Sequence, residues 1–511
     1  MARYKAYSYE QKLMIPVSLE NQILAGTFEY TLNLVIDEMD LSSFDERYDN
    51  DSTGASAYDP AILLKIILYA YSKGIISSRK IALLCEENIV CMALAADTRP
   101  HFTTIANFVS TMGQACIDLF TKVLAVCYSE NLIGKQMFAI DGCKISSNCS
   151  KEWSGTKAEL LTKVEKIGKA VEYLVTKHRA SDLDPDDPTE RKREEESVRK
   201  LKAKAAKITS WLGNHEEKLG AAGTPVKSNI TDNDSAKMAT SHGVIQGYNG
   251  IAAVDDKHQT IVWATVYGDN NESGHLPEIL EGVEDSCRKT GIDQNVLTSV
   301  KITADTGFHS ERNMKLVCEK GIDAYIPDNR FRSRDVRFKD ADRYKKKVAE
   351  WQPAKGRKYF GPQDFRIDQE SGLLICPAGN PMWLKTPNYQ SLGGRYRGKA
   401  YMGHLHHCQN CQLRTKCIRN EHTKARQVVL FDTDSPAMKI NYTVLMQKRI
   451  DSPEARSLYS KRMGTVEPVF GHLAGTKRLN RFTLRGNGKV NTQWLLYCVV
   501  HNLGKIQRYG T

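Results

Sequence analysis

The sequence predicts an α/β protein whose mixed β-sheet core is interrupted by two insertions and preceded by an all-α region. Three observations predict this fold class. The first 130 residues carry helix start and stop signals, and short apolar strand patterns alternate with helical patterns up to residue 328. Two stretches break that alternation. Residues 151–225 are highly charged with helical spacing, and residues 329–440 are basic and contain cysteines.

The composition indicates a soluble, multidomain protein. A chain of 511 residues is too long for one ordinary core, and 41% hydrophobic with 26% charged residues is typical of globular proteins. No apolar run reaches transmembrane length, and the first residues, MARYKAYSYEQK, are too polar for a signal peptide. We therefore expect a cytoplasmic, bacterial protein that binds no membrane. The 13 cysteines argue against a secreted disulfide framework.

Positive charge is concentrated in the C-terminal part of the chain. The net charge is +12, but residues 301–511 hold 39 Lys and Arg against 18 Asp and Glu, whereas the first 300 residues hold 33 against 42. Such asymmetry predicts a surface that binds a polyanion, with a merely solvated basic face as the alternative.

Residues 1–130 are expected to be helical. Asp59-Pro60 is a helix start signal for the run AILLKIILYAYSKG, which ends in a glycine, and one long helix is expected from about Thr103 to Ser129. Short helices joined by tight turns are typical of a helix-turn-helix-like DNA-binding module and equally of a plain helical bundle.

The order of elements after residue 130 matches an RNase H-like fold. The charged stretch breaks at residues 182–188 and has 16 basic and 14 acidic residues over 151–220, which favours a solvated helical hairpin. Strands are expected at 136–146, 250–254, 260–267, in VKITAD up to Asp305 and in AYIPD, and helices at 276–290, 310–320, 453–474 and 490–507.

Three carboxylates are candidates for metal-assisted phosphoryl transfer. Asp141 lies in the apolar strand FAIDG, where a charge is costly unless it is paired or metal-bound, and Asp305 ends KITAD before Thr306-Gly307-Phe308. Glu467 lies near the middle of a helical segment. Carboxylates on rigid elements suit two Mg²⁺ ions, although each residue alone also suits a cap or turn.

These carboxylates lie in motifs that resemble a known family. AIDGCKIS, ITADTGFHS and RMGTVEPVFGHLAGTKRLNRFTLRG resemble the three catalytic blocks of bacterial insertion-sequence DDE-type transposases. DEMDLSSF, YDPAILLKIILYAYSKGIISSRKI, PHFTTIANF, NITDNDSAKM and GYNG resemble the branch with a helical N-terminal domain and a Cys-rich insertion. The resemblance covers nearly the whole chain.

The resemblance implies an enzyme that binds the terminal inverted repeats of its element, cleaves double-stranded DNA and transfers the strand, as a homodimer on DNA. Asp141, Asp305 and Glu467 are then the ligands of two Mg²⁺ (or Mn²⁺) ions per active site. Four other aspartates are alternatives for the second carboxylate and are less favoured than Asp305: Asp232, Asp234, Asp255 and Asp256.

The resemblance also implies residues that contact DNA. Tyr459 and Arg462 match a Tyr-Arg-Glu-Lys signature that positions DNA phosphates, although the Arg–Glu interval is one residue longer than in some relatives. Ala474 stands where the family usually has Lys. The expected replacements are Lys477 and Arg478, and the further DNA-binding candidates are Arg481 and Arg485 in the same block and Arg79 and Lys80 in a turn between two N-terminal helices.

Four cysteines have the spacing of a structural zinc site. Cys376, Cys408, Cys411 and Cys417 follow the pattern C-x31-C-x2-C-x5-C, and a closed set of four thiolates leaves no position for substrate. His404, His406 and His407 are alternative ligands, and reduced cysteines without metal are the simpler interpretation.

Four segments follow from these patterns. They are a DNA-binding domain (1–130), the first part of the catalytic core (131–328), a zinc-binding insertion (329–440) and the C-terminal helices of the core (441–511). Two other functions fit the same sequence: an RNase H-like nuclease without strand transfer, and an inactive DNA-binding protein derived from a transposase.

Overall fold

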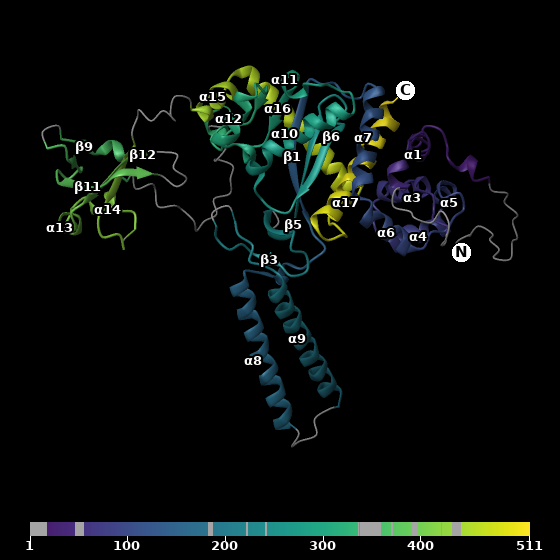
Figure 1. The fold of residues 1–511 in the computed structure, drawn as a ribbon, viewed down its shortest axis with the longest axis horizontal. Coiled ribbons are helices and arrows are strands. Elements are labelled where there is room, and N and C mark those ends of the chain that lie inside the picture. The colour runs from purple at the N-terminus through teal and green to yellow at the C-terminus, as the bar shows by residue number, and fades with distance from the viewer. Residues whose placement is uncertain are drawn as a thin grey trace, which may run out of the picture. The chain divides into compact units, whose positions relative to one another are not determined.

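The computed structural model describes residues 18–45, 56–181, 188–220, 223–240, 243–335, 337, 359–368, 371–390, 397–420, 422–431 and 441–510 (Figure 1). Contacts within the chain define two units. The first comprises Met1–Asp328 and Arg449–Thr511, and the second comprises Asn329–Lys448.

The N-terminal region is helical, as expected. Asp59 caps the third helix by accepting a hydrogen bond from the backbone N–H of Ala61, with Pro60 in the first turn, and Gly74 follows its end with a φ of +74°. The helices are α1 (Phe28–Asp37), α2 (Ser42–Asp45), α3 (Pro60–Ser72), α4 (Ser78–Glu87), α5 (Ile89–Leu94), α6 (Phe102–Thr111) and α7 (Gly113–Ser129).

The single long helix expected from Thr103 to Ser129 is wrong. Met112 leaves the helical conformation, with φ −94° and ψ 38°, and its side chain is buried between the two halves of the segment. Gly113 restarts the chain at an angle, so that α6 and α7 are bent by 78°. None of the described helices is by itself long and apolar enough to cross a membrane, and only the bent α6–α7 pair meets that test by length and composition.

The core is a six-stranded mixed sheet with the order expected of an RNase H-like fold. Its central strand β1 is antiparallel to β5 on one side and parallel to β7 on the other, and β8 extends the parallel part. The far side of β5 pairs first with β4 and then with β6. The strands are β1 (Met137–Ser146), β4 (Ala236–Thr240), β5 (Gly243–Asp255), β6 (Ile261–Tyr267), β7 (Lys301–Ala304) and β8 (Ala324–Tyr325).

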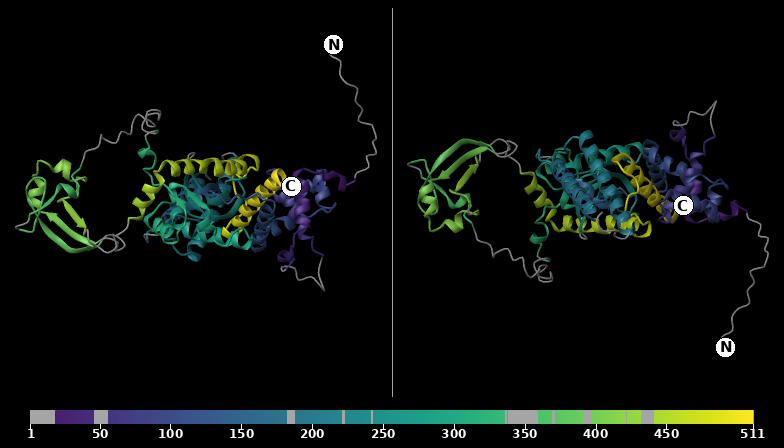
Figure 2. Two further views of the ribbon diagram at one scale, coloured as in Figure 1. Left: turned by 90° about the horizontal axis from the view of Figure 1, so that it is seen from above. Right: turned by 90° about the horizontal axis from the view of Figure 1, so that it is seen from below.

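Helices pack against this sheet and join it to the N-terminal region. α17 (Asn487–Tyr509) is buried along most of its length and contacts β6, α3 and α7, while α16 (Pro453–Gly471) contacts β1 and β7 (Figures 1 and 2). The side chain of Asn502 exchanges two hydrogen bonds of 2.9 Å with the backbone of Ile261 in β6. The remaining helices of this unit are α10 (Glu272–Lys289), α11 (Val296–Ser299) and α12 (Glu311–Glu319).

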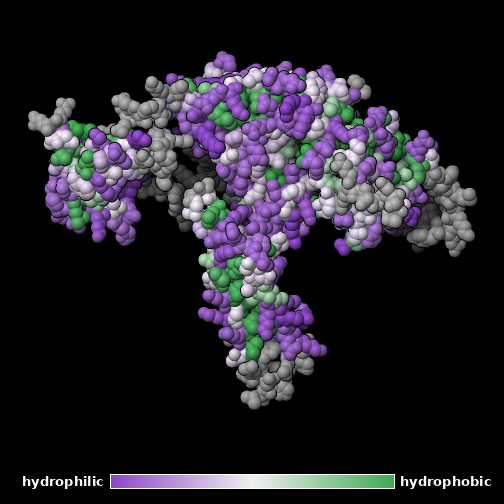
Figure 3. All heavy atoms as spheres, viewed as in Figure 1, coloured by the Kyte–Doolittle hydropathy of each residue, from purple (hydrophilic) through white to green (hydrophobic). Residues whose placement is uncertain are grey.

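The charged stretch forms the expected helical hairpin. α8 (Lys157–Ser181) and α9 (Pro188–Asn214) pack along one another, and the turn expected at 182–188 falls mainly on residues 182–187, outside the described ones. Leu160, Ile208 and Trp211 form a small core at the base, beside the paired strands β2 (Ser154–Gly155) and β3 (Ser228–Asn229). Figure 3 shows a line of apolar atoms along the hairpin, bordered by hydrophilic ones.

The second unit has more regular structure than the sequence pattern indicated. Five antiparallel strands form a sheet in the order β13-β12-β11-β10-β9, around a core of Phe365, Leu374, Met382, Tyr401 and Val428. Its elements are β9 (Arg366–Ile367), β10 (Leu374–Ile375), β11 (Pro381–Gln390), β12 (Arg397–Gly403), α13 (Leu405–Gln409), α14 (Arg414–Cys417) and β13 (Gln427–Phe431), and α15 (Tyr442–Ile450) follows.

Candidate active site

Asp141 and Asp305 lie side by side on adjacent parallel strands. Ile140 of β1 pairs with Ala304 of β7, so the next residue on each strand is one of the two aspartates. Asp305 directly follows the last residue of β7 and accepts a hydrogen bond of 2.7 Å from the backbone N–H of Thr306, whereas Asp141 lies in the middle of β1. One rigid sheet therefore holds both carboxylates.

Arg462 of α16 bridges the two carboxylates. Its Nη1 is 2.6 Å from Asp141 Oδ2, and its Nη2 is 3.7 Å from Asp305 Oδ1. The Arg462 side chain is only 9% exposed, compared with 20% for Asp141 and 41% for Asp305. The guanidinium is thus the resident counter-ion of the pair.

Burial dominates the electrostatics of this cluster. It raises the pKa of Asp141 above the usual value, and Arg462 compensates only in part. Burial alone would lower the pKa of Arg462, but the charge of Asp141, with Tyr459 and Asp305, outweighs it and raises that pKa. Asp141 is therefore a carboxylate that strongly requires a nearby cation.

A third acid, Glu272, lies at the same site. It is the first residue of α10, and Asn249 Nδ2 donates a hydrogen bond of 3.1 Å to its Oε1. Burial raises its pKa, and so does the charge of Asp305 and, less strongly, that of Asp141. Sequence reasoning missed Glu272 because an acid after a strand, in NNESG, is typical of a helix cap.

The three acids line an open cleft of about 740 Å³. The lining residues are Asp141, Gly142, Lys144, Ser146, Ala239, Thr240, Ile245, Glu272 and Asp305. Within the described part of the chain, no three His, Cys, Asp or Glu side chains are arranged to hold a single metal ion.

The structure does not bring Glu467 to the aspartates. Glu467 lies on α16 five residues after Arg462, about 140° around the helix, and is exposed. Among the described residues it forms no hydrogen bond or ion pair. The following Pro468 lacks an N–H, and the carbonyl of Gly464 instead accepts a hydrogen bond of 3.0 Å from Gln259.

Two segments of the chain match transposase families. Residues 375–507 match the family described as Transposase DDE domain, and residues 17–111 match the family described as Transposase domain (DUF772). The chain thus carries two segments similar to transposase domains, one of them of the DDE type. No curated protein matches the sequence.

The four alternative aspartates have structural partners. Asp232, Asp234, Asp255 and Asp256 each accept a hydrogen bond from a backbone N–H, and Asp255 is fully buried with three such donors, among them Gly134 at 3.0 Å. They hold turns and loops in place. None of the four lines the cleft that contains Asp141 and Asp305.

Three of the residues expected to contact DNA lie beside Arg462 or on the surface of the N-terminal region. The Tyr459 ring centroid is 5.6 Å from the Arg462 guanidinium, and burial raises the pKa of Tyr459. Arg79 and Lys80 are exposed, but they lie in the first turn of α4 and not in the turn before it. The Arg79 guanidinium stacks 4.6 Å from the Phe102 ring centroid.

The basic residues after α16 occupy different environments. Lys477 is buried, its Nζ donates to the carbonyl of Ser72 at 3.3 Å, and burial lowers its pKa, so this lysine packs inside the protein. Arg478 is exposed and its stem packs against Gly74. Arg481 and Arg485 are exposed and donate to the carbonyls of Ser147 and Asn148, just after β1.

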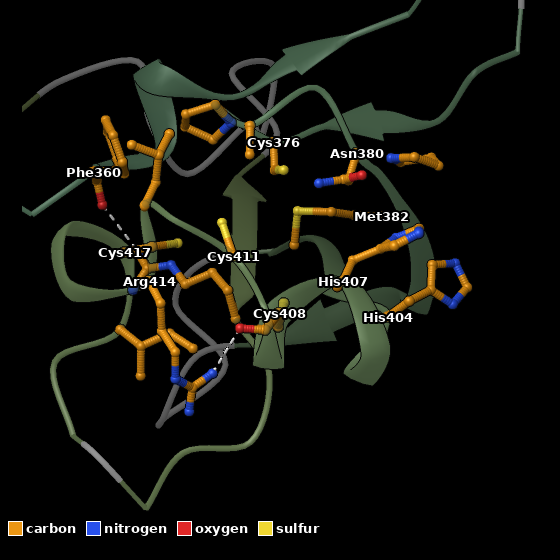
Figure 4. Close-up of a pocket in the computed structure, with 17 residues that line it drawn as sticks. Phe360, Cys376, Asn380, Met382, His404, His407, Cys408, Cys411, Arg414 and Cys417 are labelled. Atoms are coloured by element: carbon orange, nitrogen blue, oxygen red, sulfur yellow. Dashed lines mark hydrogen bonds between the residues drawn. The ribbon is translucent and has the colours of Figure 1, made fainter.

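The four candidate zinc ligands line one cavity of the second unit, with a volume of about 30 Å³ (Figure 4). Cys376 follows β10, Cys408 lies in α13, Cys417 ends α14, and Cys411 lies between the two helices. Burial raises the pKa of Cys417, and the other three thiols raise it further. Among the described residues, no three of these cysteine and histidine side chains are placed close enough to hold one metal ion.

Proposed function

We propose that this chain binds the terminal inverted repeats of its insertion sequence, cleaves the DNA there, and joins the freed 3′-hydroxyls to a target. The observation that carries the proposal is the Asp141–Asp305 pair, held by the adjacent parallel strands β1 and β7 of an RNase H-like sheet, in a chain with a DDE transposase domain. Glu467, which lies within the matched segment, is the proposed third carboxylate.

The residues at the site fit divalent metal ions such as Mg²⁺ or Mn²⁺, which DDE transposases use. Carboxylate oxygens are the ligands that Mg²⁺ prefers. Asn249 adds a buried amide oxygen that lacks a hydrogen-bond partner among the described residues. Asp141 and Asp305 would hold the ions, two per active site.

When bound, the two ions would activate the attacking oxygen and stabilise the leaving one. Asp141 and Asp305 fix the position of this chemistry because their strands are rigid. Arg462 balances the two carboxylates until metal replaces it, and its guanidinium is then available to a DNA phosphate together with Tyr459. The exposed Glu467 requires α16 to reposition when DNA and metal bind.

The two reactions share one displacement at phosphorus. In cleavage, a water molecule loses a proton and its oxygen bonds to phosphorus as the P–O3′ bond breaks, which leaves a 5′-phosphate and a 3′-oxygen that takes up a proton to become the 3′-hydroxyl. In strand transfer, that 3′-oxygen loses its proton to solvent and bonds to a target phosphorus, and the target's own 3′-oxygen leaves and is protonated. Because two ends must be joined, we propose a homodimer on double-stranded DNA.

The test uses the full-length chain on a DNA duplex that carries the terminal repeats flanking its gene. Asp141→Asn and Asp305→Asn should each lower cleavage by at least about 1000-fold while end binding persists, because each ligand supports the charge of the transition state. Asp234→Asn is the matched control and should cleave normally. An Asp305→Asn protein that cuts at near the wild-type rate would exclude this site. Cleavage without any joined product would instead indicate an RNase H-like nuclease that performs no strand transfer.

We also propose that Cys376, Cys408, Cys411 and Cys417 bind one structural Zn²⁺. Three of the four lie on short helices or in the turn between them, and all four line one cavity, where Cys376 and Cys417 pack against the small core of this unit (Figure 4). His407 also lines the cavity and is the alternative fourth ligand.

Zinc content and local stability test this site. Protein purified without chelators should carry about one zinc per chain, and Cys411→Ser should lose the metal and expose residues 371–420 to protease while the first unit keeps its melting transition. Cys318→Ser, at an exposed cysteine outside the cavity, is the control. Wild-type protein with well under one zinc and a protease-resistant second unit would show that the cysteines bind no metal.

A further inference from the structure

Glu272 is held rigidly at the cleft by two neighbours. Its Oε1 accepts a hydrogen bond of 3.1 Å from Asn249 Nδ2, and its Oε2 lies beside Gly307, where a Cβ would stand only 2.0 Å from that oxygen. Gly307 is two residues after Asp305. The absence of a side chain at Gly307 therefore allows the carboxylate to approach the end of β7.

The first turn of α10 is fixed to the segment after Asp305. Pro277 lacks an N–H, which leaves the carbonyl of Ser273 without its usual helical donor. Asn313 Nδ2 donates to that carbonyl at 2.7 Å and to the carbonyl of Phe308 at 2.8 Å. This arrangement fixes the residue that follows Glu272, and so positions the glutamate itself.

Asn249 provides independent evidence for a cation-binding site at this cleft. Its side chain is only 1% exposed, and its Oδ1 has no hydrogen-bond partner among the described residues. That oxygen points toward Gly142 of the cleft, where a Cβ would stand 2.7 Å from it. A buried amide oxygen without a donor is costly, and a cation would satisfy it.

The charge at the cleft also requires a cation. Asp141, Asp305 and Glu272 face Arg462 and Lys144, and the Lys144 Nζ donates to the backbone carbonyl of Ala239 at 3.1 Å. If Arg462 moves from the aspartates to a DNA phosphate, Lys144 is the only one of these two cations left to balance the charge of three partly buried carboxylates. Like charges this close favour a divalent ion.

We propose that Glu272, positioned by Asn249, is a further metal-ligating residue for the divalent ions of this site. The inference rests on the proposed function, since it takes Asp141 and Asp305 as metal ligands. Glu272 is partly buried beside these aspartates, whereas Glu467 is exposed. Glu272 then supplies its carboxylate without the movement of α16 that Glu467 requires.

The test measures Mn²⁺ binding to the full-length protein without DNA, from the electron paramagnetic resonance signal of free Mn²⁺. Glu272→Gln keeps the size of the side chain and can still accept from Asn249, so we expect it to fold. It should weaken Mn²⁺ binding by about 10-fold or more. Glu281→Gln, an exposed glutamate on the same helix, is the matched control and should bind Mn²⁺ like the wild type.

The outcomes separate this inference from the proposed function. Weaker binding in Glu272→Gln, in a protein with the wild-type melting temperature, supports the inference. Unchanged binding in Glu272→Gln together with weakened binding in Asp141→Asn would overturn the inference and leave the proposed site intact. Unchanged binding in both variants would overturn the metal site itself. Asn249→Asp, which adds a charge at the unpartnered oxygen, should change Mn²⁺ affinity, and a wild-type affinity would contradict the role of Asn249.

Discussion

The contacts of Arg462 in the structure differ from the role that its sequence motif predicts. Its place in the Tyr-Arg-Glu signature predicts a contact to DNA phosphates, but in the protein alone its guanidinium lies between Asp141 and Asp305. A buried carboxylate pair needs positive charge at all times, and arginine supplies it when no metal is bound. The same residue can then serve the free and the DNA-bound protein.

Replacing Arg462 should therefore destabilise the metal-free protein. Arg462→Ala leaves Asp141 partly buried without its counter-ion, and we expect a loss of about 3 kcal/mol in the free energy of unfolding. Adding Mn²⁺ should restore more stability to this variant than to the wild type, because the ion neutralises the same carboxylates. Chemical denaturation with and without Mn²⁺ measures both effects.

Arg288→Ala removes an exposed ion pair with Asp285 and is the control, with an expected change of at most about 1 kcal/mol. If Arg462→Ala were no less stable than this control, the guanidinium would not be the counter-ion of the aspartates.

At the scale of elements, α17 connects the sheet and the N-terminal helices. Its buried side includes polar residues that have hydrogen-bond partners. Asn502 binds the backbone of β6, and His501 Nε2 lies 2.9 Å from the carbonyl of Gln259. His501 Nδ1 also lies 3.4 Å from Nδ1 of His472. Burial lowers the pKa of both histidines, that of His501 to about 3.

This burial predicts a pH-dependent stability. In the unfolded chain His501 binds a proton near its ordinary pKa of about 6.5, whereas the folded protein resists protonation until about pH 3. Stability from this group is thus complete above pH 6.5 and falls as the pH decreases toward 3, by about 1.4 kcal/mol per pH unit. The free energy of unfolding should differ less between pH 7.5 and pH 5 in His501→Gln than in the wild type. An equal pH dependence in the two proteins would show that His501 is not the group responsible.

At the scale of the whole molecule, the N-terminal helices are not an independent body. They belong to the same compact unit as the sheet, and α3 and α7 pack against α17 near the other end of the chain. Tyr71 of α3 and Tyr497 of α17 have ring centroids 4.9 Å apart, both fully buried. Separating residues 1–130 from α17 would expose these apolar faces to water.

We therefore expect a fragment of residues 1–130 to fold poorly alone, with a weakly dispersed amide NMR spectrum and no cooperative melt. Joining α17 to the fragment through a flexible linker should restore both, because it covers the faces of α3 and α7. A fragment that melts cooperatively without α17 would show that the N-terminal helices are an autonomous domain.

Much of the fold was predictable because local patterns decide it. Asp59-Pro60 fixes a helix start, the apolar strand around Asp141 fixes the centre of the sheet, and charged helical spacing fixes the hairpin. The bend at Met112 was not predictable from local patterns, since it depends on the burial of the Met112 side chain in the folded protein. The five-stranded sheet of the second unit was missed because its strand pairing is decided by tertiary structure and not by a local pattern.

The sequence by itself determined the type of chemistry here, through carboxylates in apolar strands, a basic C-terminal half and motifs of a DDE transposase. Only the tertiary structure decided which of these groups meet. It placed Arg462 between the aspartates, added Glu272 and left Glu467 exposed, because proximity depends on strand register and helix rotation. It also buried Lys477, whose charge alone predicts a surface position. A sequence records which groups are present, whereas distances between remote groups arise only from packing.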